Sequence, residues 1–210
     1  NIKLKSNFKF KYFLFLESFN NKDNFFVLKK LDNFIEKNKK FKNYKILYRP
    51  HPWQKKNRSI LIENEFKNLI IDPQLKKKYL SLKFSSSFQP DIKYYSSLIK
   101  NAEVVITGPT SMLIEATIFY KKILLLAYKS KSSTPYSEEL KNFEHLKGIE
   151  NLKNIKTVNI ESDFINKLMK TLDLNIDKSK VDKLRNFYLD YSGQKYSDKL
   201  FKVTNKIIND

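Results

Sequence analysis

The chain has 210 residues and 41% of them are hydrophobic, so it can bury a core and is too apolar to be intrinsically disordered. It contains no cysteine, which excludes disulfides, zinc–thiolate sites and cysteine nucleophiles. The net charge of +19 invites a polyanionic partner, but only Arg49, Arg58 and Arg185 among the 41 basic residues are arginine. Because nucleic-acid recognition favours arginine, this composition argues against nucleic acid and leaves an anionic membrane surface as an alternative partner.

The first half of the chain alternates short apolar runs with amphipathic segments. Apolar runs that end in polar or proline-rich segments predict strands, and apolar residues at helical spacing predict helices. In chain order we predict a strand at 8–17, a helix at 25–38, strands at 44–48 and 68–71, and a helix at 91–100. Asp91 lies near the positive end of that last helix, while the polar segment 76–87 shows no clear pattern.

The second half continues the alternation. We predict a strand at 102–106, a helix at 112–120, a strand at 123–128, a short helical stretch at 140–146, a strand at 156–160, a helix at 162–172 capped by Ser162, and terminal helices at 178–190 and 197–208. Strands that alternate with helices predict an α/β fold with a doubly wound parallel sheet. We therefore expect a Rossmann-like domain over residues 1–177 and a C-terminal helical tail over residues 178–210.

A hydroxyl-rich turn follows the predicted strand at 102–106. Gly108 and Pro109 end the strand, and Thr110 and Ser111 are residues that cap a helix well. Hydroxyls and free helix amides at the carboxyl end of a strand form a typical anion site in open α/β sheets. Glu115 follows about one helical turn later, where its carboxylate is suited to a ribose diol. The alternative is that the hydroxyls only cap the helix and Glu115 only complements its dipole.

A second polar turn, Arg49-Pro50-His51-Pro52, directly follows the predicted strand at 44–48. Carboxyl ends of parallel strands share one edge of a sheet, so this turn belongs to the same edge as the Gly108 turn. Prolines restrict the backbone and hold the loop stiffly. Arg49 can bind two phosphate or carboxylate oxygens, and His51 can donate a hydrogen bond or a proton to a phosphate. The alternative is an ordinary turn in which His51 is a satisfied loop histidine.

Other familiar sites are not indicated by the sequence. The three glycines fit neither a P-loop nor a GxGxxG fingerprint. His51 and His145 are distant and lack a metal-ligand spacing, so we expect no metal, and we expect His145 to be a surface or loop residue. Acidic residues such as Asp72 stand in no recognisable catalytic pair.

Taken together, these motifs resemble the donor-binding half of GT-B glycosyltransferases. The residues that carry the resemblance are Tyr48 to Pro52, then, about fifty residues later, Gly108-Pro109-Thr110-Ser111 with Glu115 and Ala116, followed by the apolar run 122–126. They look most like the bacterial surface-polysaccharide group, which includes sialyl- and Kdo-transferases with a His-Pro motif and CDP-glycerol glycerophosphotransferases with a similar Arg-Pro-His-Pro. The terminal stretch Phe187–Ile208, with Asp190 to Gly193 before a last helix, also looks like the tail helix of such proteins.

The resemblance implies a role for each candidate residue. His51 would contact the donor phosphate and help the nucleotide to leave, and Arg49 would support the same phosphates or a donor carboxylate. Thr110 and Ser111, in the turn that Gly108 and Pro109 form, would hold phosphate oxygens. The donor-binding residues expected outside that turn are Glu115 for the ribose hydroxyls and Ser18, whose loop would face the same cleft.

The resemblance also implies partners. The donor would be a CMP- or CDP-linked sugar or glycerol phosphate, the acceptor a glycan or a lipid-linked glycan, and no metal or other cofactor is expected. The general base of these families belongs to an N-terminal acceptor-binding half for which this chain has no room, so we expect the chain to bind a donor without turnover. We expect it in the cytoplasm, with the inner face of the membrane as a further expected location.

Two alternatives stay open. A sugar-nucleotide epimerase similar to UDP-GlcNAc 2-epimerases shares the strand–Ser–helix–Glu-Ala arrangement and predicts a uridine preference, although no Gly-Gly stands next to Ser111. A non-catalytic basic module would bind nucleic acid or anionic lipid with a steep salt dependence.

Overall fold

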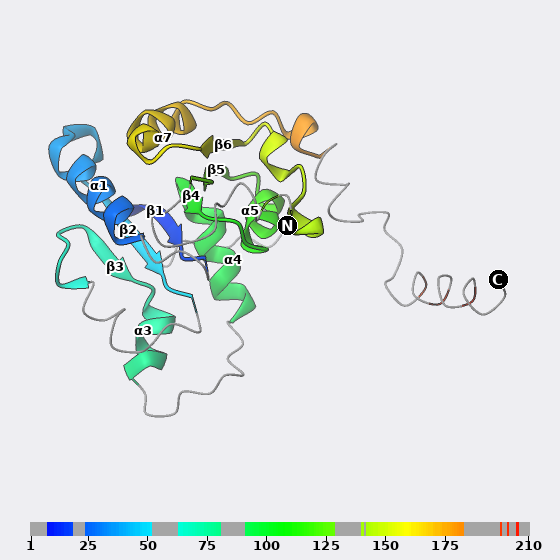
Figure 1. Ribbon diagram of the computed structural model, residues 1–210. Coiled ribbons are helices and arrows are strands. Elements are labelled where there is room, and N and C mark those ends of the chain that lie inside the picture. The colour runs from blue at the N-terminus through cyan, green and yellow to red at the C-terminus, as the bar shows by residue number, and fades with distance from the viewer. Residues whose placement is uncertain are drawn as a thin grey trace.

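A six-stranded parallel sheet forms the centre of the molecule (Figure 1). The computed structural model describes residues 8–18, 24–51, 63–80, 91–128, 140, 142–182, 198, 201 and 205. The strands lie in the order β3-β2-β1-β4-β5-β6. They are β1 (Lys11–Leu16), β2 (Tyr44–Arg49), β3 (Leu69–Ile71), β4 (Val104–Thr107), β5 (Lys122–Leu126) and β6 (Ile155–Val158). The prediction of a doubly wound parallel α/β sheet is confirmed.

Helices cover both faces of the sheet (Figure 1). On one face α1 (Asn24–Lys37) and α7 (Phe164–Leu172) pack against the sheet, and on the other face α4 (Ile92–Asn101) and α5 (Met112–Ile118) do so. Helix α3 (Pro73–Leu80) follows β3. Short 3₁₀ turns are η1 (Lys39–Phe41), η2 (Glu144–Leu146), η3 (Ile149–Asn151) and η4 (Glu161–Asp163).

Strand β1 shows why the sheet is buried on both faces. Its residues alternate between two cores: Phe13 and Phe15 pack toward α1, whereas Leu14 and Leu16 pack toward α4 and α5. All four side chains are fully buried. A continuous apolar run of this kind is typical of a central strand in a parallel sheet, because helices remove both faces from water.

Several helix ends differ from the predictions. Asp91 does cap α4, since its carboxylate accepts hydrogen bonds from the amides of Lys93 and Tyr94. Ser162, in contrast, lies inside η4, and α7 begins at Phe164 without a side-chain capping bond, so the predicted Ser162 cap is wrong.

Helix α3 covers part of the segment in which no pattern was seen. Pro73 is its first residue, a position where the missing amide costs nothing, and the Asp72 carboxylate accepts from the Gln74 amide at 2.9 Å.

The chain leaves α5 at Ile118, two residues earlier than predicted, and Tyr120 adopts a left-handed conformation with φ of 52°. The Tyr120 hydroxyl donates to the Asp182 carboxylate at 2.6 Å, and Val181 is fully buried. The start of the predicted tail therefore packs on the domain. Most of the two predicted terminal helices lies outside the described residues, and the boundary at residue 177 stays a prediction.

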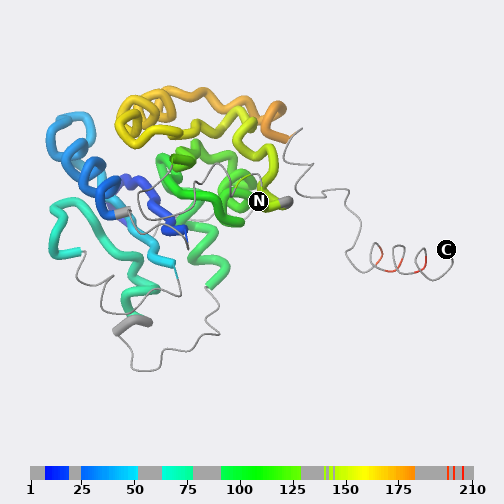
Figure 2. Tube along the Cα trace, viewed as in Figure 1, coloured from blue at the N-terminus to red at the C-terminus, as the bar shows by residue number. Residues whose placement is uncertain are grey.

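The order of the strands reverses beside β1. From β1 the chain moves outward to β2 and β3, and then returns to add β4 on the other side of β1; Figure 2 shows blue β1 between cyan β2 and green β4. In open parallel sheets ligands bind in the crevice beyond the carboxyl ends of the strands at such a switch point. No helix within the described residues combines the length and the apolar composition needed to cross a bilayer.

Candidate functional site

Three strands bring the two predicted polar turns to the switch point. Leu16 on β1 pairs with Arg49 on β2 and with Thr107 on β4, so these three residues lie at one level across the sheet. The residues that follow them, among them His51 and Gly108, therefore emerge side by side at the carboxyl edge. Neighbouring strands are about 4.8 Å apart, so the two turns flank β1 at a separation of roughly 10 Å. A phosphate group fits between such turns.

The end of β1 fixes the His51 loop. The Glu17 amide donates to the Arg49 carbonyl at 3.0 Å, and the His51 amide donates to the Glu17 carboxylate (Oε2) at 3.0 Å. Ser18 follows at the same edge and is 2% exposed. Pro50 is buried as well, whereas Pro52 lies outside the described residues. Two hydrogen bonds with Glu17 thus hold the backbone of the loop in the free protein.

His51 is a titratable group at this edge, two residues after the end of β2. Its side chain is half-buried, and burial lowers the pKa of the imidazole below its usual value. At neutral pH the imidazole is therefore uncharged, with one nitrogen that donates and one that accepts. Such a group can donate a hydrogen bond to a phosphate and can take up a proton once an anion is bound.

Arg49 points into the protein. Its guanidinium forms an ion pair with Asp72, and both side chains are buried. The guanidinium also lies 4.8 Å from the centre of the Tyr95 ring. Asp72 accepts a further hydrogen bond from the Tyr94 hydroxyl at 2.8 Å. The positive charge is thus committed to a buried network that joins β2, β3 and α4.

The predicted role of Arg49 as a phosphate ligand stays a prediction, and the network gives the residue a second function. It holds the end of β2 against α4 directly below the His51 loop. Desolvation also raises the pKa of Tyr94, with further contributions from the charge of Asp72 and from the hydrogen bond to it, so the phenol stays protonated as the donor.

Solvent exposure increases along the turn after β4. Gly108 and Pro109 are buried, Thr110 is half-buried and Ser111 is exposed. Ser111 occupies the N-cap position of α5 but makes no side-chain capping bond, so the expectation that its hydroxyl caps the helix is wrong.

The first amides of α5 are less available to an anion than predicted. The amide of Leu113 donates to the Thr110 carbonyl and that of Ile114 to the Ser111 carbonyl, both at 3.0 Å. An anion at this turn would therefore be bound mainly by the hydroxyl groups, and the Ser111 hydroxyl makes no capping bond to the helix.

A pocket of about 310 Å³ opens between α4 and α5, beside this turn. Its lining is mostly apolar and consists of Ile92, Tyr95, Ser96, Ile99, Glu115, Ile118 and Phe119. Two polar groups converge in it, the Glu115 carboxylate and the Tyr95 phenol. Burial and the nearby charge of Glu115 raise the pKa of Tyr95 well above its ordinary value. The two groups nevertheless fall short of hydrogen-bond geometry, and the Tyr95 hydroxyl is buried without a partner among the described residues.

An apolar pocket with a few convergent polar groups is the usual form of a small-molecule site. The Tyr95 ring contacts Arg49, and Glu115 lies one turn of α5 beyond Ser111. The pocket therefore shares Tyr95 with the Arg49 network and α5 with the turn after β4, and its lining includes no residue of either turn.

The sequence reasoning missed three parts of this arrangement. Glu17 anchors His51, Asp72 neutralises Arg49, and Tyr95 faces Glu115. A signal existed for Asp72 and Glu17, because each directly follows or ends a predicted strand at the carboxyl edge. Nothing distinguished Tyr95 from an ordinary apolar residue of an amphipathic helix.

The remaining candidates lie elsewhere. His145 is exposed in η2, as predicted. Within the described ranges, no group of three or more acidic or histidine side chains is arranged to hold a metal ion.

No family model matches the chain, and no curated protein matches it significantly. Similar solved structures include WaaG, a glycosyltransferase involved in lipopolysaccharide biosynthesis, with 11% identity, a TM-score of 0.45, and coverage of 85% of this chain and 43% of that chain. They also include an α,α-trehalose-phosphate synthase (UDP-forming) from Burkholderia xenovorans in complex with glucose-6-phosphate, with 12% identity, a TM-score of 0.47, and coverage of 83% and 39%. This chain spans less than half the length of each, and the likeness is one of overall fold.

Proposed function

We propose that this chain binds a nucleotide-activated donor at the carboxyl edge of its sheet and provides the donor site of a GT-B-type transferase that builds surface polysaccharide. The observation that supports this most is the combination of three features, two of them at the β1–β4 switch point and one between the neighbouring helices α4 and α5. These are the anchored His51 loop, the uncapped hydroxyls of the turn after β4, and the pocket that contains Glu115 and Tyr95. Together they suit the two ends of a nucleotide.

The phosphate end of the donor fits between the two turns. The uncharged His51 imidazole donates a hydrogen bond to a phosphate oxygen, and Ser111 and Thr110 donate from the other side. A bound phosphate favours the protonated imidazole, so His51 takes up a proton and can return it as the phosphate leaves. This sequence of events needs no metal.

The nucleoside end fits the pocket between α4 and α5. An ionised carboxylate such as that of Glu115 can accept from the two hydroxyls of a ribose. The buried Tyr95 hydroxyl gains in the same ligand the partner that the free protein does not supply.

The finer parts of the proposal follow from the motif resemblance alone. The donor is CMP- or CDP-linked and carries a sugar or glycerol phosphate. The acceptor is a glycan or lipid-linked glycan, and the base that activates it belongs to a second, acceptor-binding half, without which this chain binds donor but does not transfer. The chain works in the cytoplasm.

Calorimetric titration with CDP and 2′-deoxy-CDP tests the proposal at Glu115. The wild-type chain is expected to bind CDP roughly tenfold more tightly than 2′-deoxy-CDP, because one hydrogen bond to a charged group contributes about that factor. In Glu115→Gln most of this preference disappears, whereas binding of 2′-deoxy-CDP changes little. Absence of binding of any nucleotide at millimolar concentration contradicts the proposal.

A matched pair of histidine variants provides the control. His51→Ala is expected to weaken CDP binding, and His145→Ala, at the exposed second histidine, is expected to leave it unchanged. A preference for UDP over CDP that survives in both variants would favour the epimerase alternative.

A further inference from the structure

The amino edge of the sheet, opposite the candidate site, collects lysines. In a parallel α/β fold every strand starts at this edge and every helix between strands ends there. At the starts of β1 and β2 and at the end of α1 the structure places six exposed lysines, which we call the lysine corner. The lysine corner consists of Lys9, Lys11, Lys37, Lys39, Lys40 and Lys42.

The lysine corner is compact because β1 and β2 are paired. Lys11 lies opposite Tyr44 in the strand register, with its Nζ 5.7 Å from the centre of the Tyr44 ring. The Tyr44 ring in turn contacts Phe41, at a centroid distance of 5.1 Å, and Phe41 belongs to the same short turn as Lys39 and Lys40. The two segments that carry these lysines thus meet at the contact between the Phe41 and Tyr44 rings.

Acidic groups nearby do not neutralise the lysine corner. None of its six lysines forms an ion pair with a described residue. Glu36 pairs with Lys67, outside the corner, and the buried Asp32 accepts from the amides of Lys67 and Asn68. Glu103 is half-buried beside Tyr44. Desolvation raises the pKa of the Tyr44 phenol most, and the charge of Glu103 raises this pKa further. The corner therefore keeps most of its positive charge.

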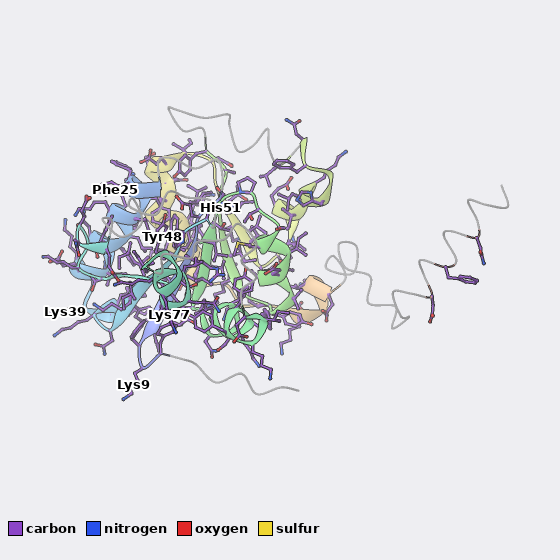
Figure 3. The ribbon with its side chains drawn as sticks, turned by 90° about the horizontal axis from the view of Figure 1, so that it is seen from below. Lys9, Phe25, Lys39, Tyr48, His51 and Lys77 are labelled. Atoms are coloured by element: carbon purple, nitrogen blue, oxygen red, sulfur yellow. The ribbon has the colours of Figure 1, made fainter. Side chains whose placement is uncertain are left out.

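Among the described residues the charge is also unevenly distributed. At the carboxyl edge acidic residues are frequent in the described part of the chain: Glu17, Asp72, Asp91, Glu115, Glu161 and Asp163. Figure 3 shows Lys9 and Lys39 projecting on the side of the molecule opposite His51 and Phe25.

Helix dipoles account for only a small part of this pattern. A lysine in the last turn of a helix is favourable, and Lys37 occupies that position in α1. Lys39, Lys40 and Lys42 lie beyond the end of α1, and Lys9 and Lys11 precede or begin a strand. Their common location thus has no explanation in secondary structure alone.

We propose that the lysine corner docks this chain on a bilayer that contains anionic phospholipid. Lysines offer a diffuse charge rather than the forked recognition that arginine gives to nucleic acid. Single-stranded nucleic acid also needs exposed aromatic rings on which bases stack. The rings at this corner, such as Phe10 and Tyr44, are only half-exposed.

Docking through the lysine corner has a consequence for the candidate site. Strands β1 and β2 have six residues each and span roughly 20 Å, so their carboxyl ends are held about that far above the headgroups. The site would then face the cytoplasm, and a growing glycan of some length would reach it more easily than a headgroup would.

Sedimentation with vesicles tests this proposal on the full 210-residue chain. One set of vesicles contains phosphatidylcholine alone, and the other contains phosphatidylcholine with about one-third phosphatidylglycerol. Binding is expected only to the second set and is expected to fall steeply with added salt. Since each surface lysine contributes a factor of about five, the triple variant Lys39→Glu/Lys40→Glu/Lys42→Glu should bind at least about 100-fold more weakly.

A triple variant with the same change in net charge provides the matched control. Lys77→Glu/Lys93→Glu/Lys147→Glu alters lysines outside the lysine corner and should retain most of the binding. Equal losses in the two triple variants, or equal binding to both sets of vesicles, would overturn the proposal. Tighter binding to a 20-nucleotide single strand than to the anionic vesicles, with the same dependence on the corner, would assign the surface to nucleic acid instead.

Discussion

Arg49 and His51 are two residues apart in the chain, yet they face different environments. The Arg49 side chain is 6% exposed and paired with Asp72, whereas the His51 side chain is half-buried at the carboxyl edge. A buried charge is stable only if it keeps its partner, because the desolvation of an isolated ion costs several kcal/mol. The pair therefore stabilises the fold below the candidate site, and His51 is the residue of the two that we propose to contact the ligand.

The Arg49–Asp72 pair makes a prediction about stability. Replacement of Asp72 by alanine leaves the guanidinium buried without a counterion, and we expect the free energy of unfolding to fall by about 3–5 kcal/mol. Glu36→Ala removes an exposed pair with Lys67 and should cost less than about 1 kcal/mol. Urea denaturation of both variants measures the difference. Equal losses would show that the buried pair is not a structural element.

Sequence reasoning could identify His51 and the hydroxyls of the turn after β4 because each stands next to an apolar run that ends there. It could not identify the partner of Arg49, since Asp72 is 23 residues away and only the β2–β3 pairing brings them together. The failed prediction at Ser111 has a local cause. The first amides of α5 bond to backbone carbonyls, so the helix does not need the hydroxyl.

At the scale of the element, α4 contributes more to the site than its pattern indicated. Its apolar spacing predicted a helix that packs on the sheet, and Leu98 and Ile99 do so. The same periodicity directs Tyr95 toward Glu115 on α5, which no pattern within one helix can reveal. Helix α3 was missed for a related reason, because Pro73 marks the end of a strand and is equally suited to begin a helix.

Removal of the Tyr95 hydroxyl should affect ligand binding and stability differently. Because it has no partner among the described residues, Tyr95→Phe should leave the free energy of unfolding unchanged or raise it slightly. The same change should weaken CDP binding by about five- to tenfold, the value of one hydrogen bond. Calorimetry and urea denaturation measure the two effects.

Tyr12→Phe is the matched control for Tyr95→Phe. The Tyr12 hydroxyl donates to the Leu98 carbonyl at 2.8 Å inside the core. Its loss should therefore lower the free energy of unfolding by roughly 1 kcal/mol and leave CDP affinity unchanged. A Tyr95→Phe protein that loses stability but not affinity would remove Tyr95 from the site.

At the scale of the whole molecule, the fold separates two surfaces. The polar turns lie at the carboxyl edge of the sheet. The lysine corner lies at the amino edge, and Figure 3 labels two of its members, Lys9 and Lys39. The start of the predicted tail belongs to the same body, since Val181 is fully buried and Asp182 accepts from Tyr120. The alternation of strands and helices predicted this body well, because every strand is a short apolar run.

A substitution at Val181 tests how strongly the start of the predicted tail packs on the domain. Val181→Ala should lower the free energy of unfolding by roughly 2 kcal/mol, and the protein should still unfold in a single transition. Lys178→Ala, at an exposed neighbour, should have little effect. If Val181→Ala is equally neutral, the segment from residue 178 onward is an appendage, in line with the predicted boundary.

The central claim is that a nucleotide phosphate binds beside His51, and the chain is well suited to a direct measurement because it contains only two histidines. A proton NMR titration follows the resonances of both imidazoles. The His145→Ala variant shows which resonance belongs to which histidine. In the free protein His51 should titrate below the ordinary imidazole range, since its burial disfavours the charged form.

Addition of saturating CDP should raise the pKa of His51, because the phosphate charge favours the imidazolium, and should leave the His145 resonance in place. CDP affinity should accordingly increase as the pH falls toward the pKa of His51, and this dependence should be absent in His51→Ala. Tight binding of CDP with no change in the His51 resonance would contradict the account, since the nucleotide would then bind away from the switch point between β1 and β4.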